Sequence, residues 1–228
     1  MAEKIKIYSI FNSIDGEVNR FHQGGFTTFI RFAGCNLKCS YCDTLYAQDP
    51  NCGKEMTVAQ IIKEVKTFGC KKVTITGGEP LMQIDGFIEL CQQLQAREYD
   101  ISVETNGTID GEEFIQCIDC WVVDYKLPSS GVKEKQINMN FLEDLNDQDF
   151  VKFVITCKGD YVIAKKAMKK IIKNNSNFDP PYFAFSPMHG SLEPQTLVEW
   201  IQKDKLFDNI IINLQLHKYI WKNAEKEV

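Results

Sequence analysis

The sequence Cys35-Asn-Leu-Lys-Cys39-Ser-Tyr-Cys42 brings three cysteines together in the spacing C-x3-C-x2-C. Thiolates are the usual ligands of iron–sulfur clusters, and this close spacing lets one short loop bind several irons of a cluster. A [4Fe–4S] cluster has four irons, so a loop with three sulfurs leaves one iron open to a small molecule. A zinc site and reduced structural thiols are the alternatives. A structural zinc ion normally takes four protein ligands, and the candidate for a fourth, Cys52, stands outside the usual zinc-finger spacing.

This run resembles the cluster loop of radical S-adenosylmethionine enzymes, in which an aromatic residue usually precedes the last cysteine, as Tyr41 precedes Cys42. The resemblance implies that the amino and carboxylate groups of S-adenosylmethionine chelate the fourth iron. An electron from the cluster then cleaves the sulfonium to give a 5′-deoxyadenosyl radical. The resemblance also implies an electron donor such as flavodoxin or ferredoxin.

A second motif, Thr76-Gly-Gly-Glu-Pro80, follows a predicted strand. Gly77 and Gly78 lack a Cβ, so the backbone there can approach a ligand closely. Taken alone, Gly-Gly before proline is an ordinary tight turn. After the cysteine loop, the motif resembles the GGE motif of the same enzymes, which implies that Glu79 holds the methionine amino group of S-adenosylmethionine.

The composition predicts a single domain spanning residues 1–228. The 228 residues are 44% hydrophobic, and no linker or repeat interrupts them. The sequence has neither a hydrophobic signal segment nor a membrane-spanning apolar run, so we expect a cytoplasmic protein without membrane contact. A net charge of −5 argues against direct nucleic-acid binding. Nine cysteines in a cytosolic chain favour metal or catalytic use, although Cys117 and Cys120 are predicted to be buried thiols, with an auxiliary cluster as the alternative.

Strands and helices alternate along most of the chain. Strands are predicted at 4–11, 26–32, 72–76, 101–104, 121–124, 150–156, 182–185 and 210–214. Helices are predicted at 58–68, 85–97, 112–117, 141–145, 161–173 and 194–203. This alternation predicts parallel βα units in an α/β fold, which either close toward a barrel or stay an open sheet. The family resemblance implies a partial (β/α)6-type barrel.

Polar residues gather where six of the predicted strands end. They are found at Cys35 and at 76–79, 104–106, 124–126, 186–189 and 215–217. In both architectures the functional groups sit at the carboxyl ends of the strands. The sequence therefore predicts that these residues form one site.

Four further segments narrow the resemblance, at 13–17, 42–44, 104–108 and 216–221. Together they resemble 7-carboxy-7-deazaguanine synthase nearly end to end. That family of small radical enzymes in queuosine biosynthesis contracts 6-carboxytetrahydropterin to a 7-deazaguanine and uses Mg²⁺. The resemblance implies a pterin or 7-deazapurine substrate and a homodimer.

The resemblance also assigns roles to single positions. Thr44 would bind Mg²⁺ through its hydroxyl, with a helix cap as an even alternative. The residues implied to bind S-adenosylmethionine are Tyr41, Cys42, Asp43, Gly77, Gly78, Glu79, Asp124, Tyr125, Lys126, Ser130, Ser186 and Pro187. The residues implied to bind substrate are Ile14, Asp15, Gly16, Arg31, Thr76 and His217. The predicted catalytic residues are Asp15, Glu17 and Glu104; a solvated strand end is the alternative for Glu104, and a core histidine for His217.

The first loop departs from the synthase pattern, which usually reads Ile-Gln-Gly-Glu-Gly where this chain has Ile14-Asp-Gly-Glu-Val18. An anion in a desolvated pocket would repel the carboxylate of the synthase substrate unless Mg²⁺ or Arg31 intervenes. It would suit a cationic amine instead. Queuine lyase, a salvage enzyme of the same group, has such a substrate and releases 7-aminomethyl-7-deazaguanine from queuine. We therefore expect lyase activity, with the synthase as the alternative, although Asp15 could also pair with the guanine-like edge that both substrates share.

A glycyl-radical activating enzyme is an alternative of another class, because such enzymes share the cysteine loop and the GGE motif. They would not need the loop at 15–17 or the segment at 216–221. A bare iron–sulfur electron carrier fits less well, because it needs neither the Gly-Gly-Glu pocket nor the polar strand ends.

Overall fold

The computed structural model describes residues 3–111, 117–177, 179–222 and 227. Within these residues nine strands form one sheet, in the order β3-β1-β2-β4-β5-β6-β7-β8-β9. The strands are β1 (Lys4–Ile14), β2 (Phe26–Phe32), β3 (Lys54–Thr57), β4 (Lys72–Gly77), β5 (Asp100–Thr105), β6 (Cys120–Asp124), β7 (Phe150–Ile155), β8 (Tyr182–Pro187) and β9 (Ile210–Ile212). The helices are α1 (Val58–Thr67), α2 (Ile84–Gln95), α3 (Met139–Glu143), α4 (Lys158–Asn174), α5 (Pro194–Asp204) and α6 (Leu216–Ile220).

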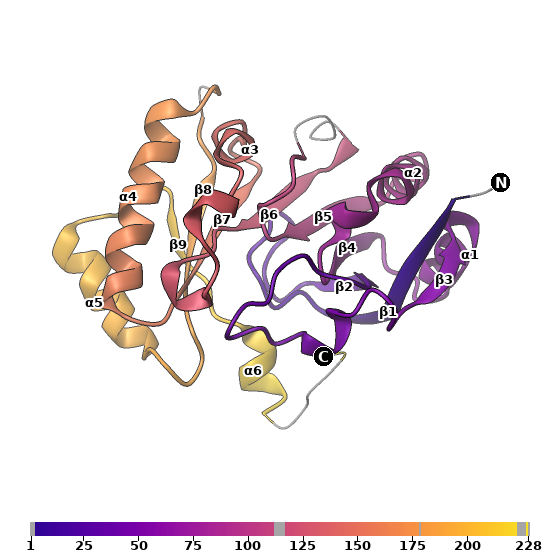
Figure 1. The fold of residues 1–228 in the computed structure, drawn as a ribbon, viewed down its shortest axis with the longest axis horizontal. Helices are drawn as coiled ribbons and strands as arrows, with labels where there is room; N and C mark the ends of the chain where they lie inside the picture. The colour runs from indigo at the N-terminus through magenta and orange to yellow at the C-terminus, as the bar shows by residue number, and fades with distance from the viewer. Residues whose placement is uncertain (1–2, 112–116, 178, 223–226, 228) are drawn as a thin grey trace.

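The sheet is parallel from β2 to β9, and β1 pairs antiparallel with both β2 and β3 at one edge. This arrangement confirms the predicted βα alternation in an α/β fold. The edge strands β3 and β9 are not paired with each other in the described residues, so the sheet is open and the barrel is partial. Figure 1 shows α1 to α5 around the outside of the curved sheet, with α6 apart from them beside the loop that follows β2.

Alternation along the strands separates the core from the site. In β6, Trp121 is fully buried in the main core, where its ring contacts Phe87 and Phe141 at centroid distances of 6.3 and 5.2 Å. The neighbouring residues Val122 and Asp124 point to the other side and line a cavity. Successive side chains of a strand face opposite sides of the sheet, so one strand serves both the core and the cavity.

Local signals explain why α1 forms where the sequence predicts a helix. Thr57 caps the helix, since the Gln60 N–H donates to Thr57 Oγ at 3.3 Å and the Thr57 N–H donates to Gln60 Oε1 at 2.9 Å. Such a capping box satisfies two backbone donors at the helix start. Gly69 follows the helix with φ +68°, a left-handed conformation that glycine adopts without strain.

Other boundaries differ from the prediction. The polar strand β3 was not predicted, because Lys54–Thr57 has no apolar alternation and is held by pairing with β1. The short helix α6 was also not predicted, and α4 begins at Lys158 instead of Tyr161. The helix predicted at 112–117 falls almost wholly outside the described residues. No helix in the described part of the chain is long and apolar enough to cross a membrane.

Candidate active site

A cavity of about 400 Å³ lies at the carboxyl ends of the parallel strands, a size typical of small-molecule sites. Most of the predicted site residues line it together. These are Ile14, Gly16, Glu17, Arg31, Cys35, Cys39, Tyr41, Cys42, Asp43, Thr44, Thr76, Gly77, Gly78, Glu104, Asp124, Lys126 and His217. Residues far apart in the sequence thus converge on one cavity, as the strand-end argument predicted.

Hydrogen bonds from the backbone of the cysteine loop and from the Ser40 side chain hold the loop against its neighbours. The Ser40 N–H donates to the Ser130 carbonyl at 2.9 Å, and Ser40 Oγ donates to the Ser129 carbonyl at 2.6 Å. The Cys35 N–H donates to the Gln48 carbonyl at 3.0 Å. These bonds hold the loop in place, and its three cysteines line the cavity.

The three cysteines supply the donors that an iron–sulfur cluster needs. Cys35, Cys39 and Cys42 are free thiols that line the same cavity. In the described residues no three His, Cys, Asp or Glu side chains are gathered around one ion position. A [4Fe–4S] cluster binds each thiolate at a different iron, so it needs thiols that are spread around it and not convergent on one point. Cys52, the candidate fourth zinc ligand, is exposed and does not line the cavity.

Burial raises the pKa of the Cys35 and Cys39 thiols. In the metal-free protein both thiols are therefore protonated at neutral pH. Binding to iron deprotonates such thiols. Asn106 Nδ2 lies 3.8 Å from Cys35 Sγ and also donates to Asn36 Oδ1 at 2.8 Å, so it links the cysteine loop to the end of β5.

The two glycines of Thr76–Pro80 allow close contact between β4 and the start of the cysteine loop. A Cβ on Gly78 would lie 1.9 Å from the Gly34 carbonyl oxygen, and one on Gly77 would lie 2.3 Å from that of Phe32. Gly77 also has φ +138°. No other residue fits such contacts without moving the backbone. The glycines are thus needed for the fold as well as for the cavity wall.

Glu79 has internal partners and does not line the cavity. Its Oε1 accepts from Thr105 Oγ at 2.8 Å and from the Leu81 N–H at 3.1 Å. Its Oε2 accepts from the Asn106 N–H at 2.7 Å. The carboxylate therefore fixes the turn after β5 that carries Asn106 to Cys35. Its predicted contact with the methionine amino group remains a prediction.

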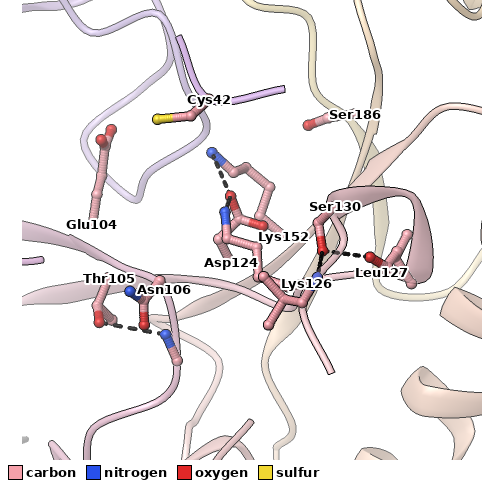
Figure 2. A network of polar contacts seen from close by, with 12 residues as sticks. Cys42, Glu104, Thr105, Asn106, Asp124, Lys126, Leu127, Ser130, Lys152 and Ser186 are labelled. Atoms are coloured by element: carbon pink, nitrogen blue, oxygen red, sulfur yellow. Dashed lines mark hydrogen bonds and ion pairs between the residues drawn. The ribbon is translucent and has the colours of Figure 1, made fainter. Parts of the chain in front are cut away.

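A charged network crosses the cavity wall (Figure 2). Lys152 Nζ lies 3.4 Å from Glu17 Oε2 and 3.6 Å from Asp124 Oδ2. Lys126 Nζ lies 2.7 Å from Asp124 Oδ2. These cations hold the pKa of Asp124 below its usual value despite burial, and the carboxylates around Lys152 raise the pKa of its ammonium. Asp124 and Lys152 thus stay ionised at neutral pH.

Three buried polar atoms on the cavity wall have no hydrogen-bond partner within the described residues. They are Tyr41 Oη, Arg31 Nε and Asp124 Oδ1. A buried polar atom without a partner is costly and calls for a ligand or a bound water. Tyr41 and Asp124 are predicted to meet S-adenosylmethionine, and Arg31 is predicted to meet substrate. The open hydrogen-bonding capacity therefore fits polar ligands at these positions.

Oxygen ligands suitable for Mg²⁺ lie near the end of the cysteine loop. Thr44 Oγ donates to Asp43 Oδ1 at 3.1 Å, and both residues line the cavity. Carboxylate and hydroxyl oxygens are ligands that Mg²⁺ prefers. Thr44 precedes a short 3-10 helix but makes no side-chain capping bond to it. Thr44 thus occupies the N-cap position of this helix, but its hydroxyl does not cap it.

His217 closes the other side of the cavity above the first loop. A Cβ on Gly16 would lie 2.8 Å from His217 Nδ1, so only glycine allows this approach. Burial lowers the pKa of His217, which keeps its ring neutral at pH 7. A neutral ring can both donate and accept a hydrogen bond.

Several predicted residues do not line the cavity. They are Asp15, Glu79, Tyr125, Ser130, Ser186 and Pro187. Ser130 Oγ donates to the Leu127 carbonyl at 2.6 Å, and Ser186 Oγ lies 2.7 Å from Asn213 Nδ2 (Figure 2 shows both serines). Their hydroxyls thus serve the protein's own loops. Whether they meet S-adenosylmethionine stays a prediction.

Cavity residues that the sequence did not single out include Lys152, Gln48 and Lys218. Lys152 gives one usable signal, because it is a charged residue inside the otherwise apolar strand Phe150–Ile155. Buried lysines are rare unless they are paired. A lysine within a strand of this kind therefore predicts acidic partners, although not which ones.

Replacing Glu104 with glutamine should change how stability depends on pH. Burial raises the pKa of Glu104 from its ordinary 4.5 to about 7, so the folded protein binds this proton more tightly than the unfolded chain. The stabilisation is complete below pH 4.5 and is lost as pH rises through about 7. The Glu104→Gln variant lacks this loss. Its free energy of unfolding should therefore rise by up to about 3 kcal/mol relative to that of the native chain as pH increases from 4.5 to above 7. Denaturant unfolding of both proteins at several pH values measures it, and a constant difference would contradict the assigned pKa.

Comparisons with known proteins agree with this geometry. Residues 29–119 match the model of the Radical SAM superfamily. The chain is 37% identical to the 7-carboxy-7-deazaguanine synthase of Clostridium acetobutylicum, covering 98% of this chain and 99% of that protein. It is 36% identical to the enzyme of the same name from Chlorobaculum tepidum, covering 95% and 94%. The chain belongs to the 7-carboxy-7-deazaguanine synthase family of radical S-adenosylmethionine enzymes.

The fold agrees with that family as well. The crystal structure of QueE from Escherichia coli superposes with a TM-score of 0.69 at 20% identity, covering 92% of each chain. Membership confirms the predicted family and implies a [4Fe–4S] cluster and S-adenosylmethionine as cofactors. The three thiols on the cavity wall are the residues that would hold that cluster.

Proposed function

We propose that the chain is a 7-carboxy-7-deazaguanine synthase that acts on 6-carboxytetrahydropterin. Arg31 carries the proposal, because it lines the cavity and its buried Nε has no partner within the described residues. Its guanidinium lies over the rings of Phe11 and Tyr46, at 5.7 and 5.9 Å from their centroids. An arginine fixed in this way suits the carboxylate of the pterin. It would repel the ammonium of queuine.

The expectation of a queuine lyase depended on an unbalanced anion at Asp15. The Asp15 carboxylate pairs with Lys72 at 2.8 Å and does not line the cavity. Its charge is balanced inside the protein, so it gives no reason to prefer a cationic substrate. The curated relatives are named 7-carboxy-7-deazaguanine synthase, which also supports synthase activity over lyase activity.

The residues of the chain would divide the work between cofactors and substrate. Cys35, Cys39 and Cys42 would hold the cluster, which with S-adenosylmethionine supplies one-electron chemistry when bound. Asp43 and Thr44 would offer oxygens to Mg²⁺. Arg31 would bind the substrate carboxylate. The proposal includes a small-protein electron donor such as flavodoxin or ferredoxin, a homodimer and a cytoplasmic location.

A two-substrate assay tests this function. The anaerobically reconstituted protein is given reductant, S-adenosylmethionine and Mg²⁺, with either 6-carboxytetrahydropterin or queuine, and the products are identified by mass spectrometry. We expect 7-carboxy-7-deazaguanine from the pterin and no turnover of queuine. Release of 7-aminomethyl-7-deazaguanine from queuine would show the lyase instead. No turnover of either molecule, with S-adenosylmethionine cleavage intact, would favour a glycyl-radical activating enzyme.

A further inference from the structure

A buried ion pair lies beneath the cavity, outside the site described above. Lys72 Nζ and Asp15 Oδ2 are 2.8 Å apart, and their side chains are only 8% and 2% exposed. Asp15 Oδ2 also accepts from Thr74 Oγ at 2.9 Å. Lys72, Thr74 and Thr76 alternate along β4 and so share one face of the sheet. Thr76 reaches the cavity at the end of that face, and the ion pair lies deeper on it.

The ion pair holds the backbone of Glu17 from two sides. The Glu17 N–H donates to Asp15 Oδ1 at 3.4 Å. Lys72 Nζ donates to Asn19 Oδ1 at 2.7 Å, and Asn19 Nδ2 donates to the Glu17 carbonyl at 3.2 Å. Both backbone polar groups of Glu17 are thus linked to the pair, either directly or through Asn19.

Gly16 and Glu17, which the Asp15–Lys72 pair holds in place, line the cavity. The Glu17 carboxylate lies 3.4 Å from Lys152, and Gly16 approaches His217 closely. The loop closes on itself behind them, because the Asp15 N–H donates to the Gly25 carbonyl and the Gly24 N–H donates to the Asp15 carbonyl, both at 2.7 Å. A displacement of the pair would therefore move Gly16 and Glu17 together.

We propose that Asp15 and Lys72 are positioning residues that set Gly16 and Glu17 against the substrate, and that Asp15 does not contact substrate itself. The proposal rests on the proposed function for the identity of that substrate. It also explains the aspartate in this loop, since a carboxylate neutralises the buried ammonium of Lys72 and a glutamine would not. Removing either partner leaves a buried charge without its counterion, which distorts the loop.

The test compares Asp15→Asn, Lys72→Met and the double variant with both changes. Each single variant should raise KM for the pterin by on the order of tenfold to a hundredfold, because small displacements of positioning groups have effects of this size. S-adenosylmethionine cleavage should stay near the native rate. Amide hydrogen exchange in the metal-free protein should accelerate in residues 15–25. The double variant removes both charges, and its new asparagine side chain can still bond Thr74 and the Glu17 N–H, so it should recover most of both properties.

Lys165→Met is the matched control, because it breaks a partly exposed ion pair with Asp204 far from the loop. It should change neither KM nor exchange in residues 15–25. A double variant as impaired as the worse single variant, or single variants with native exchange in the loop, would overturn the proposal. If Lys72→Met does not fold, Asp15→Asn against the double variant gives the same comparison. Hydrogen exchange in the metal-free protein tests positioning even if the native chain does not turn over the pterin. Failure of this proposal can therefore be distinguished from failure of the proposed synthase function.

Discussion

Replacing Cys39 with alanine is expected to remove iron binding and to reduce S-adenosylmethionine cleavage to background. Cys39 lines the cavity with Cys35 and Cys42, and the three thiols face one space. A cluster with an open iron has only three protein ligands, so the loss of one leaves too few to retain it. Iron content, the visible absorbance of the reconstituted protein and formation of 5′-deoxyadenosine measure the effect.

Cys52→Ser is the matched control for this experiment, because Cys52 is exposed and lies outside the cavity lining. We expect it to keep native iron content and native cleavage. Loss of iron in this variant would mean that the loop takes a fourth thiolate, and the three-ligand account would then be wrong. The same comparison separates an iron–sulfur cluster from a zinc site, which would need the fourth ligand.

The predicted features that were confirmed depend either on short local motifs or on the order of strands and helices along the chain. The C-x3-C-x2-C loop needs only a short stretch to bring its thiols to one cavity. Gly77 and Gly78 are recognisable from the Gly-Gly-Glu-Pro motif, and their contacts with Phe32 and Gly34 explain why no other residue type fits there. The convergence of strand ends follows from parallel topology, which the alternation of strands and helices already predicts.

The features that the sequence did not predict depend on partners from distant strands. Asp15 was expected to face substrate, because nothing near it in the sequence indicates that Lys72 lies 2.8 Å away. Glu79 was expected to hold the methionine amino group, which remains a prediction, and nothing in the sequence indicates that its carboxylate also accepts from the Asn106 N–H at 2.7 Å. In each case the direction in which a carboxylate points is decided by the tertiary fold, which residue type and spacing do not specify.

Replacing Lys152 with methionine should destabilise the protein by about 3–5 kcal/mol at neutral pH, because removing one partner of a buried ion pair leaves the other uncompensated. Lys152 is 12% exposed and lies within 3.6 Å of carboxylates from Glu17 and Asp124. Its charge also lowers the pKa of Glu104, Asp43 and Asp124. Without it these carboxyl groups take up protons more readily, so turnover of the pterin should fall steeply. Denaturant unfolding and kcat/KM measure the two effects.

Lys152→Arg and Lys4→Met are the matched controls for this prediction. Arginine keeps the cation between Glu17 and Asp124, so it should retain most of the stability but lose part of the activity, because its planar head group differs in shape. Lys4 forms an exposed pair with Glu55 at 3.1 Å, and its loss should cost less than about 1 kcal/mol. If Lys152→Met lowered the free energy of unfolding no more than Lys4→Met does, the carboxylates around the cavity would not depend on a central cation. Lys152 links Glu17, a predicted catalytic residue, to Asp124, which is predicted to bind S-adenosylmethionine. Removal of Lys152 should therefore impair both turnover of the pterin and S-adenosylmethionine cleavage. Loss of the Asp15–Lys72 pair should impair only turnover of the pterin.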